Sequence, residues 1–198
     1  MAALDAGDTL WAVHAGQSAT VEELATAAAG LSAARRWVVN GESEADRGLL
    51  LLHQAMTQTP GAERQRLLAE AEAATMAGLG VAPGQPSAWA RLAWLRDRRG
   101  NAVSAAAALR LSWLAGSVAP ELMTSRLELG VRLASVMDLE TMSLLHRQIR
   151  LTWVIAPDFV AKLAAQPEAG ALVQAALADL SKDDVADYLL RHGHVPAP

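Results

Sequence analysis

The chain has 198 residues, 52% of them hydrophobic, and a formal net charge of −4, which suits one globular domain and argues against bulk nucleic-acid binding. It has no cysteine, which excludes disulfides, thiolate catalysis and cysteine-based metal sites. It has no apolar run of about 18 residues, so no membrane insertion is expected, and Met1 to Asp5 lack the basic start and apolar core of a signal peptide.

Residues 1–60 predict an N-terminal helical cap. Alanine and leucine dominate the sequence and β-branched residues are sparse, a composition that favours helices. Thr20 and Glu23 have the spacing of a capping box, in which the hydroxyl and the carboxylate satisfy free N–H groups at a helix start. Asn40-Gly41 is expected to stop the helix that begins there. The predicted helices of this cap span residues 3–14, 20–39 and 43–56.

Residues 61–157 predict a series of helical repeats. Gly100 is expected to end a helix by adopting positive φ, and Pro120 and Asp138 are expected to begin two further helices. A tripeptide ending in Ala-Pro recurs at Pro83, Pro120 and Pro157, at a constant interval of 37 residues. Equal spacing of a helix-stopping signal indicates a helical repeat. The other predicted helices of this part span residues 62–79, 87–99 and 102–115.

Residues 158–198 predict a C-terminal helical cap, because a repeat array needs atypical end units. Ser181 begins a second capping box, and His192 and His194 in the tail are at most a weak metal pair. None of the five histidines belongs to a metal-binding or catalytic motif, so the sequence predicts no enzyme, no metal and no cofactor. The predicted helices of this part span residues 157–165, 167–180 and 181–192.

The central part resembles a tetratricopeptide repeat. The resemblance is best for residues 83–120 and partial for residues 65–83 and 126–157. Arg96 and Ser112 depart from the family pattern at its tyrosine and second alanine positions. The resemblance implies an all-α fold, a right-handed α-α superhelix (a TPR-like solenoid) with helical caps. The residues at the family spacing are Trp89, Leu92, Ala93, Gly100, Ala105 and Leu109.

The same resemblance implies a binding groove. It places Ala90, Trp94, Asp97 and Arg98 along the concave surface where such repeats hold extended peptides, and an exposed Trp beside an Arg is a good peptide anchor. The alternative is that Trp94 packs against the preceding helix.

Two further patterns concern the core and the charge. Trp89, Trp113 and Trp153 are interpreted as core between repeats, because a buried indole supplies a large apolar surface. Residues 61–120 carry seven basic and four acidic residues, whereas residues 1–60 carry three and seven. This distribution is typical of charge balance on solvated faces, and it also suits a cationic groove for an acidic partner segment.

The predicted function is a non-catalytic scaffold or adaptor that binds a protein or peptide partner through a helical-repeat groove. The alternatives are a structural accessory subunit of a bacterial envelope or membrane complex and a small-ligand-binding helical domain. The chain is also similar to uncharacterised bacterial repeat proteins that carry such a domain behind an N-terminal membrane anchor. That similarity implies a periplasmic location, with the cytoplasm as the alternative. The sequence leaves the partner and the oligomeric state open.

Overall fold

The chain is all-α. The computed structural model describes residues 2–37 and 40–178. Within these residues it contains ten α-helices, one 3-10 helix and no strand, and none of these helices is long and apolar enough to cross a membrane. The chain divides into two compact units, the first ending at Gly116 and the second beginning at Ser117. The predicted helix over residues 181–192 and the histidine pair of the tail lie outside the described residues.

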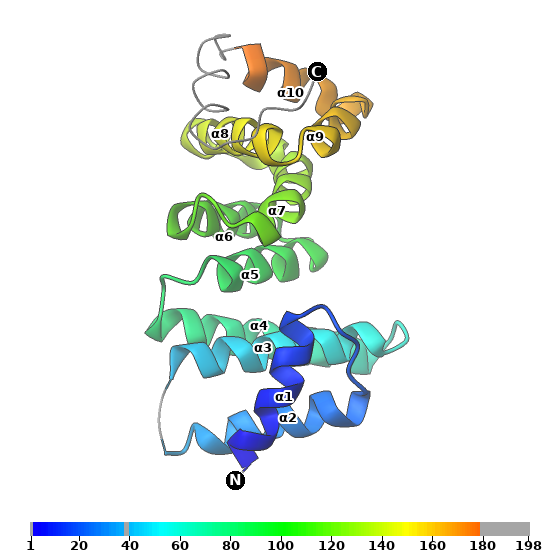
Figure 1. Cartoon of the computed structure of the whole chain (residues 1–198), viewed down its shortest axis with the longest axis vertical. Coiled ribbons are helices and arrows are strands. Elements are labelled where there is room, and N and C mark those ends of the chain that lie inside the picture. The colour runs from blue at the N-terminus through cyan, green and yellow to red at the C-terminus, as the bar shows by residue number, and fades with distance from the viewer. Residues whose placement is uncertain (1, 38–39, 179–198) are drawn as a thin grey trace. The chain divides into compact units, whose positions relative to one another are not determined.

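The first unit is built from six helices that pair with their neighbours in sequence (Figure 1). These helices are α1 (Ala2–His14), α2 (Val21–Ala34), α3 (Gly41–Thr57), α4 (Ala62–Val81), α5 (Pro86–Arg98) and α6 (Ala102–Ala115). α1 packs with α2, α3 with α4 and α5 with α6. α2 also contacts α3, and α4 contacts α5, so each pair lies against the next.

Local side-chain chemistry sets several of the helix ends. The predicted capping box is confirmed: the backbone N–H of Glu23 donates to Thr20 Oγ1 over 3.2 Å, and the Thr20 N–H donates to the Glu23 carboxylate over 2.8 Å. Gly100 adopts the predicted positive φ, 77°, directly after α5. Asn101 then caps α6, because its side-chain oxygen accepts a hydrogen bond of 3.2 Å from the N–H of Ser104.

The prediction for Asn40-Gly41 was wrong. The preceding helix ends earlier, at Ala34, and Asn40 begins α3, because its side-chain oxygen accepts a hydrogen bond of 2.9 Å from the N–H of Glu42. Asparagine suits either end of a helix, since it caps an N-terminus well and also tolerates the left-handed conformation of a C-terminus. The neighbouring glycine serves packing instead: a Cβ on Gly41 would lie 2.8 Å from the carbonyl oxygen of Gly78 on α4.

Helices α3 and α4 pack backbone against backbone. A Cβ built on Gly78 would lie 2.6 Å from the carbonyl oxygen of Gly41 and 2.7 Å from the backbone nitrogen of Ala45. One built on Gly48 would lie 2.4 Å from Thr75 Oγ1. Glycine has no side chain at these positions, so the two helices approach more closely than any larger residue permits.

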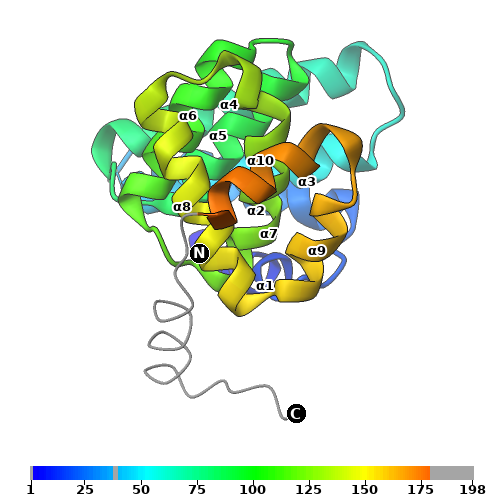
Figure 2. The ribbon, with the colours of Figure 1, turned by 90° about the horizontal axis from the view of Figure 1, so that it is seen from above.

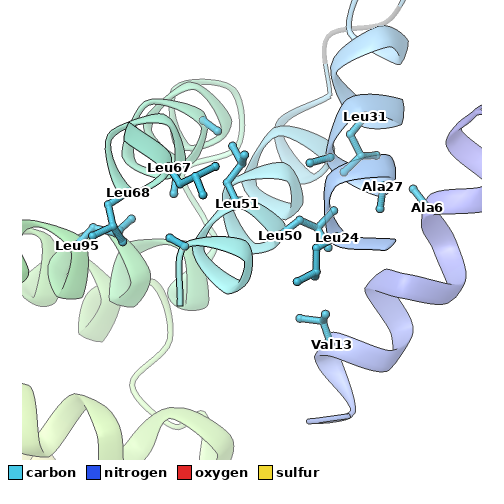
Figure 3. Packing of buried hydrophobic residues seen from close by; sticks show 14 residues of the cluster. Ala6, Val13, Leu24, Ala27, Leu31, Leu50, Leu51, Leu67, Leu68 and Leu95 are labelled. Atoms are coloured by element: carbon cyan, nitrogen blue, oxygen red, sulfur yellow. The ribbon is translucent and has the colours of Figure 1, made fainter. Parts of the chain in front are cut away.

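A continuous apolar core connects helices α1 to α5 of the first unit (Figure 3). Figure 3 shows side chains of α2 and α3 meeting each other, and side chains of α4 meeting both α3 and α5. This core holds successive pairs together, which a single helix pair cannot do alone because it leaves one apolar face uncovered. Its larger members are Leu24, Leu31, Leu50, Leu51, Leu67, Leu68 and Leu95, all 7% exposed or less.

Helices α5 and α6 use alanines and one large aromatic side chain instead of glycines. Trp113 is 2% exposed, as predicted for a core tryptophan. Ser112 is fully buried, and its hydroxyl donates to the carbonyl oxygen of Pro86 over 2.7 Å, which ties α6 to the start of α5. The buried alanines of this pair, each at most 1% exposed, include Ala88, Ala93, Ala105 and Ala108.

The other two predicted core tryptophans, Trp89 and Trp153, are only half-buried. The indole N–H of Trp89 donates to the carbonyl oxygen of Pro83 over 2.7 Å. This residue therefore fixes the turn between α4 and α5 instead of filling the core, and its polar edge is satisfied by the turn.

The second unit contains α7 (Pro120–Leu133), the 3-10 helix η1 (Ala134–Val136), α8 (Leu139–Ile155), α9 (Pro157–Ala164) and α10 (Pro167–Ala178). α8 contacts α7, α9 and α10, and α10 lies against both α8 and α9 (Figure 2). Pro120 and Asp138 begin α7 and α8 as predicted, and the carboxylate of Asp138 accepts a hydrogen bond of 2.7 Å from the N–H of Thr141. The buried side chains of this unit include Met123, Leu127, Leu145, Ile149, Val160 and Val173.

Candidate interaction surface

Helix α5 carries the four residues that the resemblance assigns to a groove. Ala90, Trp94, Asp97 and Arg98 follow at intervals of four, three and one, so they share one face of the helix. Arg98 is exposed, and the other three are half-buried. The predicted residues therefore lie together on a face of α5 that is partly open to solvent.

Trp94 contacts both the core and a charged side chain. Part of the indole packs against the hydrophobic core of the first unit. The guanidinium carbon of Arg98 lies 5.2 Å from the centroid of the ring, a cation–π geometry that orders both side chains. Trp94 is therefore anchored from below by the core and keeps part of its surface accessible.

The arginines of α5 have different partners. Arg96 Nε lies 3.5 Å from one oxygen of Glu72 on α4, and Arg99 Nη1 lies 2.5 Å from the other. These two arginines hold α5 against α4. Arg98 forms no ion pair with any carboxylate in the described part of the chain, so its charge is available to a partner.

Arg91 is the third arginine within α5, and it is directed toward α3. One of its guanidinium nitrogens donates to the backbone carbonyl oxygen of Ala45. Burial lowers the pKa of Arg91 to about 10, and the Asp46 carboxylate opposes this effect. Arg91 therefore stays protonated at neutral pH, although it makes no ion pair within residues 2–37 and 40–178.

Two histidines complete this polar region. His14 Nε2, at the end of α1, lies 3.4 Å from Asp46 Oδ1 on α3. Partial desolvation lowers the pKa of His53, and the positive charges of Arg91 and His14 lower it further. α1, α3 and α5 therefore bring His14 and Arg91 close to the Asp46 carboxylate, and His53 close to Arg91 and His14.

These side chains form one patch, named the α1–α3–α5 surface. Its members outside the predicted set are brought together by contacts between helices, which the sequence does not display. A weak signal exists, because Asp46 and His53 are seven residues apart, as are Arg91 and Arg98, and seven residues are two helical turns. The surface consists of His14, Asp46, His53, Arg91, Trp94 and Arg98.

A separate cleft of about 650 Å³ lies within the second unit. α7 and η1 form one wall, and α9 with the first turn of α10 forms the other. The residues lining it are Glu128, Val131, Arg132, Ala134, Ser135, Leu163, Gln166 and Glu168. In the described residues of both units, no three His, Cys, Asp or Glu side chains are grouped so that they could hold a metal ion.

Comparison of the chain with models of known protein families, with curated proteins and with solved structures gives no match.

Proposed function

We propose that the protein is a non-catalytic interaction scaffold that binds a protein or peptide partner through the α1–α3–α5 surface. The observation that carries this proposal is the pairing of Trp94 with Arg98. A half-buried aromatic side chain, held by a core and covered by a cation without an ion-pair partner in the described residues, has the character of an interface anchor. Anchors of this kind contribute most of the binding energy in many protein interfaces.

The finer architecture belongs to the same proposal: a right-handed, tetratricopeptide-like superhelix over residues 61–157 between helical caps. In the first unit, helix pairs succeed one another and Gly100 has the conformation the family pattern requires. Pro86 and Pro120 both occupy the first turn of a helix, and 120 − 86 = 34, the usual repeat length of about 34 residues. Pro83 precedes α5, so the helix-initiating proline comparable with Pro120 is Pro86. The periplasm remains the proposed location, on the sequence resemblance alone.

The test is recovery and reconstitution of a partner. Proteins crosslinked to the chain in its native host are identified, purified and titrated against the full chain by calorimetry. We expect the double variant Trp94→Ala/Arg98→Ala to weaken binding at least about tenfold, the effect of losing one anchor of about 1.4 kcal/mol. The matched control is Arg36→Ala/Trp37→Ala, which removes the same side-chain types where Trp37 is 88% exposed.

Thermal unfolding of each variant shows whether a loss of binding results from a loss of folding. Because Trp94 packs against the core and Arg98 is exposed, Arg98→Ala alone is the variant that leaves the core intact. A partner that binds the double variant as tightly as the original chain would disprove this surface as the binding site. An equal loss of binding in the control variant Arg36→Ala/Trp37→Ala would also disprove this surface as the binding site.

A further inference from the structure

The α1–α3–α5 surface has more positive than negative charge. Arg91 and Arg98 supply the positive charge of this surface, whereas the carboxylate of Asp46 lies 3.4 Å from His14, and Asp97, the carboxylate on the same face of α5, already has an interaction within the chain. The guanidinium of Arg91 has five N–H donors. One of these donors binds the carbonyl oxygen of Ala45. No Arg91 nitrogen is buried without a hydrogen-bond partner, so the other donors remain accessible to solvent.

The spacing of Arg91 and Arg98 along α5 predicts how far apart two acidic side chains of a bound peptide should lie. Seven residues of α-helix rise about 10 Å, and Trp94 lies between the arginines, three residues from Arg91. An extended peptide in the polyproline II conformation rises about 3.1 Å per residue with three residues per turn. Two of its side chains three residues apart therefore point the same way and are separated by about 9 Å, close to the rise along α5 between the backbone positions of the two arginines.

We propose that the partner segment is an extended acidic peptide with two carboxylates three residues apart and an apolar residue between them. One carboxylate pairs with Arg91 beside His53, the other pairs with Arg98, and the apolar side chain lies on Trp94. Arginine suits this task, because its planar guanidinium pairs with carboxylates through two parallel hydrogen bonds. This assignment rests on the function proposed above and specifies the chemistry of the partner.

A panel of fluorescein-labelled ten-residue peptides tests the assignment by fluorescence anisotropy with the full chain. The central sequence of the first peptide is Asp-Leu-Pro-Asp. The second has Asn in place of both Asp residues, the third has the same composition with the Asp residues adjacent, and the fourth has Lys in place of both Asp residues. We expect the first to bind at least about tenfold more tightly than each of the others, and its affinity to fall as salt is added.

The variant Arg98→Ala should remove most of the preference for the first peptide over the Asn peptide while leaving the melting temperature unchanged, because Arg98 is exposed. Arg36→Ala, which removes another exposed arginine outside the surface, should keep the preference. Equal binding of the first and third peptides would overturn the spacing, and equal binding of the first and second would overturn the carboxylate assignment.

Two further outcomes separate this inference from the proposed function. If a neutral peptide selected from a random library binds the original chain but not Trp94→Ala/Arg98→Ala, the scaffold function stands and the assignment of an acidic peptide is wrong. If no peptide from the panel or the library depends on these two residues, both proposals fail. Sedimentation with phosphatidylglycerol vesicles that is reduced by Arg98→Ala, without any peptide binding, would replace the acidic peptide by an anionic lipid surface.

Discussion

The helix pairs α3–α4 and α5–α6 have the same connectivity but pack differently. In the first pair, Gly41 and Gly78 bring the two backbones together, so that an added Cβ would lie 2.6 to 2.8 Å from backbone atoms. In the second pair, alanines and the buried side chain of Trp113 fill the space between the helices. The same connectivity can therefore be stabilised by glycines that let two backbones approach or by side chains that fill the space between two helices. Mutation should therefore destabilise the α3–α4 pair when it adds a side chain and the α5–α6 pair when it removes one.

The largest loss of stability is expected when the large buried side chain between α5 and α6 is removed. Trp113→Ala removes a side chain that is 2% exposed and should lower the free energy of unfolding by about 3–5 kcal/mol, because a cavity replaces packed atoms. Urea denaturation measures the change. Leu114→Ala, one residue further on and 57% exposed, is the control and should change stability by about 0.5 kcal/mol or less. Equal losses in the two variants would contradict the assigned burial.

The α3–α4 pair should instead fail by overcrowding. Gly78→Ala places a methyl group against backbone atoms of α3, which cannot rotate away, and should cost about 2–3 kcal/mol despite the better helix propensity of alanine. Gly80→Ala is the matched control on the same helix, since a Cβ there meets nothing within 4 Å. It should stabilise the protein by about 0.5–1 kcal/mol. Thermal or urea unfolding that gives both variants the same sign would show that the close approach is absent.

A smaller loss of stability is expected when one hydrogen bond between α5 and α6 is removed. The Ser112 hydroxyl joins α6 to the carbonyl oxygen of Pro86 on α5 over 2.7 Å. Ser112→Ala leaves that carbonyl without this donor and should lower the free energy of unfolding by about 1–2 kcal/mol. The exposed Ser87 in the first turn of α5 provides the control, because Ser87→Ala breaks no hydrogen bond seen between the two helices. Urea denaturation with no loss for Ser112→Ala would mean that water replaces the bond.

The smallest effect is a pH dependence on the face that joins the two pairs. The pKa of His53 is lowered in the folded chain by desolvation, Arg91 and His14, so the unfolded chain takes up the proton first as the pH falls. Protonation of this residue therefore favours unfolding below about pH 6.5, the ordinary pKa of histidine, and has no effect at pH 8.

Replacing the imidazole should remove this contribution. His53→Asn is expected to lose less stability than the original chain between pH 7.5 and pH 5, because its neighbours Asp46, His14 and Arg91 are present in both proteins and only the His53 imidazole is missing. Urea denaturation across this pH range measures the difference between the two curves. Parallel curves would show that His53 has the same pKa in the folded and unfolded states.

Most of the helices and many of their ends follow from local patterns in the sequence. The capping box at Thr20, the first-turn Pro120, the cap at Asp138 and the positive φ of Gly100 are local features, each decided by a few neighbouring residues. The boundaries of α6 were predicted to the residue for the same reason. The predicted face of α5 also needed only the helical period, because residues four and eight apart share a face of any α-helix.

The contacts that these helices make with one another follow from how the helices pack. Asn40 begins α3 instead of ending the preceding helix, and the glycine beside it, Gly41, lies against Gly78 of α4. Trp89 and Trp113 look alike in the sequence, yet one fixes a turn and the other fills a core. The contacts of Arg91 with α3 and of His14 with Asp46 join residues 46 and 32 positions apart. Such contacts depend on how helices pack, and a pattern of local spacing carries no information about packing partners.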